Sequence, residues 1–398
     1  CSNPNKMASN ILSTYSKSNI AFVKGDGSWL YTKNKTKYLD FCSGIAVNSL
    51  GHGNKLIIKA VKNQVEKLMH TSNLYTIPEQ EKLASKLCDL TFAEKVFFCN
   101  SGAEATDGLI KMIRRYHYIK GNKKRKKIIV FSNAFHGRTI TGIQAGSSQS
   151  HKEGFLDSKN ANGGFIRVPL DDTECLHKSI NDTTAGIFIE PIQGEGGINV
   201  VSAKFLKYLK KVCNDNDILL GLDEVQSGVG RTGKLFAYQW TNVKPDILSS
   251  AKGLGGGFPI GAVLLSKKTA IGMSPGTHGS TFGGNQLACA ASMAVLSQVS
   301  KESFLKKVVH KGKMIKGALE ELMSKYPNLI EGIHGKGLMI GIKCRASNTE
   351  LFEKASKNKL LLVPAANNVV RLLPPLNTSL KDIRIAINLL EKSLKDLS

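Results

Sequence analysis

The sequence has no run of apolar residues approaching the roughly 18 that a membrane-spanning helix needs, so we expect no membrane association. It also lacks a C-x-x-C pair: its eight cysteines are scattered over 398 residues. That scatter predicts reduced thiols in a cytoplasmic protein and excludes a disulfide framework. The first residues, CSNPNKMASN, show no apolar core of a secretory signal. Without internal repeats or a low-complexity linker, the sequence is typical of a large globular chain.

Acidic residues are scarce relative to basic ones. There are 31 Asp and Glu against 55 Lys and Arg, giving a formal net charge of +24. Such a balance raises the alternative of a basic nucleic-acid-binding protein. The excess is spread along the chain, however, and its only tight cluster is KKRKK at 123–127. We therefore expect no nucleic acid among the partners, although a positive field attracts anionic small molecules.

Short apolar runs alternate with helical patterns from about residue 75 onward. Five runs predict buried strands: 96–99, 128–131, 187–190, 218–223 and 262–265. This alternation predicts an α/β fold, with a mostly parallel sheet covered by helices.

The two ends of the chain have a different pattern. Residues 20–42 predict an antiparallel meander, followed by a loop at 43–48 and a helix at 55–69. Beyond about residue 300, long helices and short strands predict a smaller α+β domain. We expect three parts: 1–50, an N-terminal segment packing with the small domain; 51–299, the large domain; and 300–398, the small domain.

A lysine within a glycine-rich stretch is the most unusual local feature. Lys252 lies between small residues in LSSAKGLGGGFPIG, residues 248–261. Lysine is costly to desolvate and usually lies on the surface. A buried amine has a lowered pKa and becomes a nucleophile toward aldehydes. From this segment alone, a presented amine and a surface lysine beside a flexible turn are equally good interpretations.

Asp223 ends the apolar run ILLGLD, just upstream of Lys252 in the sequence. Ligands of open α/β sheets bind beyond the carboxyl ends of the strands, where this acid is expected. A carboxylate there, together with a presented lysine, is the combination that pyridoxal 5'-phosphate requires. The acid keeps the pyridine nitrogen protonated and the lysine holds the aldehyde.

Further polar segments follow other predicted strands. In NSGAEA, residues 100–105, a helix start offers an anion site or an ordinary capping box between Ser101 and Glu104. In AFHGRT, residues 134–139, Phe135 and Arg138 fit a ring stack and a carboxylate clamp, or a core residue and a surface charge.

Two further segments contain charged residues in unusual surroundings, one rich in glycine and one apolar. Glu190 and Glu195, in EPIQGEGG, have no histidine or third acid beside them, so we expect no metal. Arg371 is the one charge in the apolar strand VVRLLP, a costly position unless it is paired.

Three segments together resemble class III (ornithine-type) aminotransferases: LDEVQSGVGRTG, SSAKGLGGGFPIGA and GSTFGGNQLACA. The similarity extends from about Tyr15 to about Leu390, and it is greatest to the acetylornithine aminotransferase family. The resemblance implies fold type I with a seven-stranded type of sheet, pyridoxal phosphate as cofactor, and a homodimer with active sites shared at the interface.

The resemblance also implies roles around the cofactor. Lys252 bonds its aldehyde and Asp223 pairs with its ring nitrogen. Phe135 and Val225 contact the two faces of the ring, and Gln226 binds the phenolic oxygen. The phosphate is bound by Ser101, Gly102 and Ala103, and the phosphate of the neighbouring subunit by Ser280 and Thr281. His136 is expected to pack beside the ring.

Implied substrate-binding residues are Arg138, Glu190, Glu195, Arg371, Ile45 and Asn73. Arg138 would clamp a carboxylate and Glu195 would face Arg371. Ornithine aminotransferases carry a tyrosine where this chain has Ile45, which favours the acetylornithine branch. The segment GHGN, residues 51–54, lacks the His-Pro pair frequent after Gly-His in relatives, which implies a difference in loop stiffness.

The implied reaction moves the δ-amino group of N-acetylornithine to 2-oxoglutarate, giving N-acetylglutamate semialdehyde and glutamate, in arginine biosynthesis. Alternatives within the class are ornithine, succinylornithine and 4-aminobutyrate aminotransferases.

Overall fold

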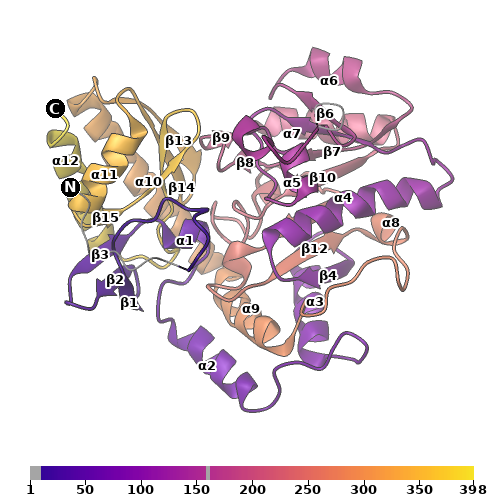
Figure 1. Cartoon of the computed structure of the whole chain (residues 1–398), viewed down its shortest axis with the longest axis horizontal. Coiled ribbons are helices and arrows are strands. Elements are labelled where there is room, and N and C mark those ends of the chain that lie inside the picture. The colour runs from indigo at the N-terminus through magenta and orange to yellow at the C-terminus, as the bar shows by residue number, and fades with distance from the viewer. Residues whose placement is uncertain (1–9, 158–161) are drawn as a thin grey trace.

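A seven-stranded sheet forms the centre of the larger lobe (Figure 1). The computed structural model describes residues 10–157 and 162–398. The strand order is β4 (Lys95–Cys99), β12 (Gly261–Leu265), β11 (Ile247–Ser250), β10 (Leu219–Asp223), β7 (Thr184–Ile189), β5 (Lys127–Phe131) and β6 (Phe165–Val168). Only β12 is antiparallel to its two neighbours, so β4 again points the same way as β11. The predicted mostly parallel sheet is confirmed, and six strands end at one edge.

The sheet is covered on both faces because its strands are apolar on both. In β10, Leu219 packs in one core cluster with Leu109 and Ile113 of α4 (Gly102–Ile119). Leu220 and Leu222 belong to the other cluster, with α7 (Ala203–Asp215). This is the side-to-side alternation of an extended strand. A Cβ on Gly221 would lie 3.1 Å from Leu109, so α4 crosses the sheet closely.

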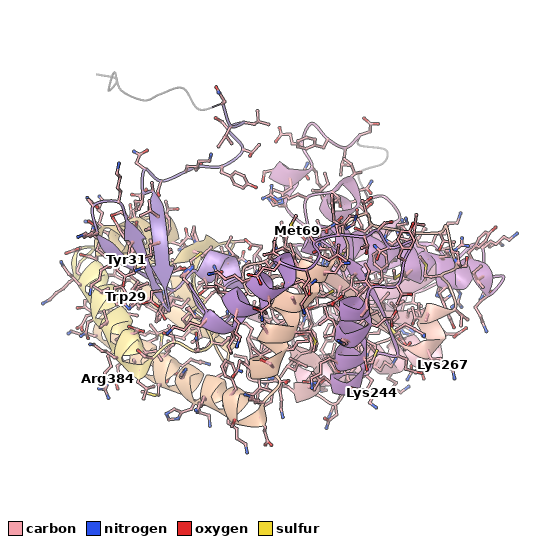
Figure 2. All side chains as sticks on the ribbon, turned by 90° about the horizontal axis from the view of Figure 1, so that it is seen from below. Trp29, Tyr31, Met69, Lys244, Lys267 and Arg384 are labelled. Atoms are coloured by element: carbon pink, nitrogen blue, oxygen red, sulfur yellow. The ribbon has the colours of Figure 1, made fainter. Side chains whose placement is uncertain are left out.

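The smaller lobe combines the two ends of the chain. β1 (Phe22–Asp26), β2 (Trp29–Thr32) and β3 (Lys37–Asp40) form the expected meander, and β15 (Leu360–Leu361) adds to β3 in parallel. Trp29 Nε1 donates to Asp382 Oδ1 at 2.9 Å, and Figure 2 shows Trp29 near the helix that carries Arg384. The division into 1–50, 51–299 and 300–398 stays a prediction.

The remaining elements complete the two lobes. A second four-stranded sheet has the order β13 (Ile330–Lys336), β14 (Met339–Cys344), β17 (Val369–Leu372) and β16 (Val363–Ala365), beside α10 (Glu302–Lys325), α11 (Asn348–Lys357) and α12 (Leu380–Lys395). The other elements are α1 (Ser43–Ala46), α2 (Lys55–Val65), α3 (Pro78–Leu90), α5 (Ile140–Ala145), α6 (Thr173–Ser179), α8 (Lys267–Ala270), α9 (Gln286–Val299), β8 (Ile192–Gln193) and β9 (Asn199–Val200). Among the described residues, no helix has the length and apolar character needed to span a membrane.

Several local expectations differ from the structure. The helix expected over 55–69 ends at Val65, because Leu68 and Met69 are exposed and have no core to pack against. The stretch 43–48, expected as a loop, contains the short turn α1. Strand β6, FIRV, was not predicted, since its arginine interrupts the apolar run.

Two glycines of α10 give a matched test of how this helix packs. A Cβ on Gly312 would lie 2.3 Å from Gly337 O, whereas one on Gly317 would meet nothing within 4 Å. We expect Gly312→Ala to destabilise the protein by about 1–3 kcal/mol through overpacking. Gly317→Ala should stabilise it by roughly 0.5–1 kcal/mol, the helix-propensity difference. Urea unfolding of both variants checks this, and equal shifts would show that α10 does not pack as closely as described.

Candidate active site

Residues at the ends of five parallel strands meet at one edge of the sheet. Asp223 ends β10, Lys252 follows β11, Glu190 follows β7, and Phe135 follows β5. Ser101 follows β4, which is parallel to β11. The sheet topology therefore brings together residues that are up to about 150 positions apart, as expected for a ligand site in an α/β protein.

Asp223 is buried and held by three groups. Its Oδ2 lies 2.7 Å from His136 Nδ1, and its Oδ1 accepts from Val225 N at 3.1 Å and Ser249 Oγ at 3.3 Å. The His136 ring stacks on Phe188 with ring centres 4.1 Å apart. His136 thus lies beneath the carboxylate and orients it. The bond between His136 and Asp223 was not predicted, because the two residues are 87 positions apart. The expectation that His136 packs beside the cofactor ring stays a prediction.

Lys252 begins a short 3-10 turn (Lys252–Leu254) with a positive φ of 44°. A residue of the N-terminal part of the chain holds this turn, because Ser49 Oγ donates to Gly253 O at 3.0 Å. Burial lowers the pKa of the Lys252 amine, opposed by the negative charge of Glu195. The interpretation as an exposed surface lysine is therefore wrong, and the lowered pKa is the property that a nucleophilic amine needs.

Arg371 and Glu195 form a two-pronged ion pair. Arg371 Nη1 donates to Glu195 Oε1 at 2.7 Å and Nη2 donates to Oε2 at 3.0 Å. Nη1 also donates to Gln226 Oε1 at 3.1 Å. Arg371 is 1% exposed and Glu195 33%, so the acid is the accessible partner. Burial raises the pKa of the Glu195 carboxyl, but Arg371 outweighs this effect and holds the pKa below its usual value.

Glu190 lies deeper and accepts from Phe135 N at 3.1 Å and Gly194 N at 3.3 Å. Burial, together with the charge of Asp223, raises the pKa of Glu190 well above its usual range. It therefore holds the Phe135 backbone and is protonated over a wider pH range than an exposed acid.

The start of α4 provides an anion-binding end. Ser101 Oγ accepts from Glu104 N at 3.2 Å, and Glu104 Oε2 accepts from Asn100 N at 2.7 Å. The Glu104 carboxylate thus binds the residue before the N-cap, and only the Ser101 half of the expected capping box is formed. Gly102 and Ala103, the first two helical residues, still have no intrahelical acceptor for their N–H groups. A Cβ on Gly102 would lie 2.7 Å from Val225 Cγ1, so glycine allows this helix end to approach β10.

A cavity of about 700 Å³ opens beside these groups. It is lined by Ile45, Phe135, Arg138 and Glu195, all predicted from the sequence, and by Ser147, Ser148, His151 and Asn348, which were not. Arg138 lies 5.7 Å from the Phe135 ring centre. No described carboxylate lies within ion-pair distance of it, so it is available to a ligand. Ser147, His151 and Asn348 come from segments without a strand or motif signal.

Ile45 reaches the cavity from a left-handed turn. The φ angles of Ser43, Gly44, Ile45 and Ala46 are 50°, 63°, 63° and 65°. Left-handed helical backbone costs roughly 1–2 kcal/mol for each residue other than glycine, and it is most unusual for a β-branched one. Ala46 packs in a small apolar cluster with Ile198, Val369 and others, and Ile45 packs against that cluster.

Asn73, Ser280 and Thr281 do not line the cavity. Asn73 Nδ2 donates to Ser280 O at 2.8 Å, and Asn100 Nδ2 donates to Ser280 Oγ at 3.1 Å. Thr281 is exposed. Their roles toward a cofactor or substrate remain predictions.

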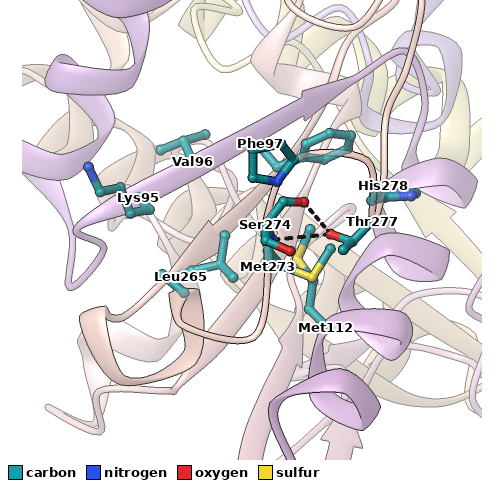
Figure 3. Close-up of a pocket in the computed structure, with 11 residues that line it drawn as sticks. Lys95, Val96, Phe97, Met112, Leu265, Met273, Ser274, Thr277 and His278 are labelled. Atoms are coloured by element: carbon teal, nitrogen blue, oxygen red, sulfur yellow. Dashed lines mark hydrogen bonds between the residues drawn. The ribbon is translucent and has the colours of Figure 1, made fainter. Parts of the chain in front are cut away.

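A different cavity, of about 390 Å³, lies at the β4 edge of the sheet (Figure 3). Its lining is mainly apolar and includes Phe97, Met112, Leu265 and Met273, but none of the predicted site residues. In the described part of the chain, no group of three or more His, Cys, Asp or Glu is placed to hold a metal.

Comparisons with known proteins identify the family of the chain. The family Aminotransferase class-III matches residues 12–394, and the chain belongs to this family of pyridoxal-phosphate-dependent enzymes. An acetylornithine aminotransferase of Agrobacterium fabrum is 47% identical over 98% of this chain and 97% of its own length. One from Brucella melitensis is 47% identical over 97% of this chain and 95% of its own.

Solved structures show the same fold. An ornithine aminotransferase from Toxoplasma gondii has a TM-score of 0.91 at 30% identity, covering 98% of this chain and 93% of its own. An N-acetylornithine aminotransferase from Stenotrophomonas maltophilia has 0.84 at 31%, covering 97% and 98%. The predicted fold type I is thus confirmed, as are the family and the cofactor.

The side chains and backbone N–H groups at this site match the groups that pyridoxal phosphate needs. Lys252 offers an amine to its aldehyde and Asp223 a carboxylate to its ring nitrogen. Gly102 and Ala103 offer free N–H groups to its phosphate, where only glycine fits against Val225. These residues are the proposed holders of the cofactor, with Ser101, Phe135 and Gln226 around them.

Lys252 should be the single lysine bonded to the cofactor. Borohydride fixes the reversible bond between a lysine and the cofactor aldehyde, so peptide mapping should find the pyridoxyl group on Lys252 alone. Lys210, which is paired with Asp246 at 2.9 Å, serves as the unlabelled internal control. Lys252→Ala should abolish labelling and lower turnover by several orders of magnitude. Label on any other lysine would overturn the assignment.

Proposed function

We propose that the chain transfers the δ-amino group of N-acetylornithine to 2-oxoglutarate, giving N-acetylglutamate semialdehyde and glutamate, in arginine biosynthesis. The observation that carries this proposal is the cavity itself. It combines an apolar wall at Ile45, the unpaired Arg138, and an arginine masked by Glu195. The names of the relatives support the same substrate.

Pyridoxal phosphate, when bound, supplies an electron sink that acidifies the carbon bearing the reacting amine. The protein residues direct that chemistry. Asp223, oriented by His136, would hold a proton at the ring nitrogen. The Lys252 amine, with its pKa lowered by burial, is suited to take a proton at Nζ and return it elsewhere.

The Glu195–Arg371 pair explains how one site accepts two different amines. The reacting end of N-acetylornithine has no carboxylate beside its amine, whereas glutamate has its α-carboxylate there. A bare buried arginine would be unpaired with the first substrate, at a desolvation cost. We infer that Glu195 neutralises Arg371 when acetylornithine binds and moves aside for glutamate. Arg138 would hold the distal carboxylate of either substrate. Glu195 is followed by two glycines and is one-third exposed, which supports such movement.

The assembly is proposed to be a cytoplasmic homodimer. Leu74, Tyr75 and Phe282 are exposed by 87%, 70% and 58%, and they flank Asn73 and Ser280 in sequence. Such contiguous apolar exposure is typical of a protein interface. Ser280 and Thr281 would then complete the partner's cofactor site.

Substrate preference tests the function directly. An apolar Ile45 tolerates an acylated chain but offers no hydrogen bond to a free α-amine. We expect kcat/KM to be higher for N-acetylornithine than for ornithine by at least about tenfold, the scale of roughly 1.4 kcal/mol. Steady-state assays with both donors, and with succinylornithine and 4-aminobutyrate, check this. Equal values for the first two would assign the chain to the ornithine branch.

Single half-reactions test the ion-pair movement. Glu195→Ala should leave the glutamate half-reaction as fast or faster and slow the acetylornithine one, because Arg371 stays bare. Arg371→Ala should weaken mainly glutamate and 2-oxoglutarate. Stopped-flow spectra of the bound cofactor follow each half separately. If both variants slow both halves by one common factor, the pair is only structural.

A further inference from the structure

The left-handed turn Ser43–Ala46 places a strained backbone at the wall of the substrate cavity. Four successive residues have φ between 50° and 65°, and three of them are not glycine. Backbone strain of this kind persists only where surrounding contacts determine it. The contacts that hold the turn therefore also fix the position of Ile45.

The two flanks of the turn are tied to the C-terminal part of the chain. Leu373 N donates to Phe41 O at 2.6 Å, and Leu376 N donates to Ser49 O at 2.8 Å. These bonds fix where the segment starts and ends. They leave the path of residues 42–46 between them to other contacts.

Asp40 holds the start of that path. Its Oδ1 accepts from Cys42 N at 2.9 Å and from Ser43 N at 2.8 Å. Cys42 O in turn accepts from Ile45 N at 2.9 Å and Ala46 N at 3.1 Å. One carboxylate oxygen thus orients the two peptide groups from which the left-handed turn begins.

His52 fixes the other oxygen of Asp40. Its Nε2 lies 2.7 Å from Oδ2, and the side chains are 16% and 3% exposed. Because a carboxylate only accepts, Nε2 carries the proton. His52 is itself bound to the meander, since its N–H donates to Gly27 O at 2.8 Å and its carbonyl accepts from Gly27 N at 3.0 Å. A Cβ on Gly25 would lie 2.5 Å from His52 Cβ, so the ring has little room to move.

We propose that the Asp40–His52 pair is a latch for the left-handed turn and, through Ile45, determines selectivity among amine donors. Asp40 and His52 are positioning residues, since neither lines the cavity. The selectivity part rests on the proposed function. The latch itself does not, because it concerns the conformation of residues 42–48.

Variants of His52 separate the hydrogen bond from the bulk of the ring. His52→Leu removes the donor. His52→Gln is the matched control, because its amide nitrogen can reach the position of Nε2. In His52→Leu, the amides of residues 42–48 should exchange hydrogen at least about tenfold faster, because local opening is easier. Exchange in β10 should be unchanged, and His52→Gln should remain close to the original protein.

The same variants should change selectivity in a defined way. The ratio of kcat/KM for N-acetylornithine to that for ornithine should fall at least about fivefold in His52→Leu, mainly through the KM of N-acetylornithine. The KM for 2-oxoglutarate should stay within about twofold, because Arg138 and Arg371 are not touched. His52→Gln should restore most of the ratio.

A glycine rescue distinguishes strain from general loosening. Ser43 has a φ of 50°, and its buried Oγ has no hydrogen-bond partner. Glycine adopts this backbone without steric cost. Ser43→Gly in the His52→Leu background should therefore recover part of the protection and part of the ratio. A purely structural role of His52 predicts no recovery.

The outcomes are separable. Unchanged exchange at 42–48 in His52→Leu would overturn the latch, whatever the substrate. Faster exchange with an unchanged donor ratio would overturn the link to selectivity. A wild-type ratio near one would overturn the proposed substrate alone, with the exchange result still deciding the latch.

Discussion

The site depends on balancing the charges of side chains that are mostly buried. Two cationic groups, Lys252 and Arg371, share it with the acids Asp223, Glu195 and Glu190. Burial shifts the pKa of Lys252 down and that of Glu190 up, so each moves toward its neutral form. Arg371 keeps its charge and is therefore the group that most needs a partner. The geometry of Glu195, Gln226 and Pro364 around it follows from that need.

Rigid and adjustable parts of the site come from different kinds of structure. Asp223 and Glu190 stand at strand ends inside the packed sheet, and His136 holds the former from below. Glu195 lies in a glycine-rich turn, and Ile45 in a turn tied to the other lobe. The carboxylates of Asp223 and Glu190 are thus held by the sheet, whereas Glu195, for which we propose a movement, lies in a glycine-rich turn.

Sequence reasoning placed several residues at or just after apolar strands, whose ends the sheet topology brings together, and the family resemblance implied the roles of most of them. Lys252, Asp223, Phe135 and Glu190 are of this kind. It did not predict the bond between His136 and Asp223, and it missed His151, Ser147 and Asn348 in the lining of the cavity. The left-handed turn at Ile45 was also unpredictable, since isoleucine disfavours it and the contacts that hold it, among them those of Asp40 and His52, come from outside the turn.

The smaller lobe forms only when the two ends of the chain come together, which affects how a newly synthesised chain folds. Ser28 Oγ donates to Thr378 Oγ1, and these residues are 350 positions apart. Ribosomes add about 5–20 residues per second, so the N-terminal meander waits roughly 18–70 s for the strands and helix that cover it. During that interval the large sheet has time to form, while the turn that carries Ile45 has no partner on its C-terminal side. The turn that carries Ile45, one wall of the cavity, is therefore among the last parts to be fixed on a newly made chain.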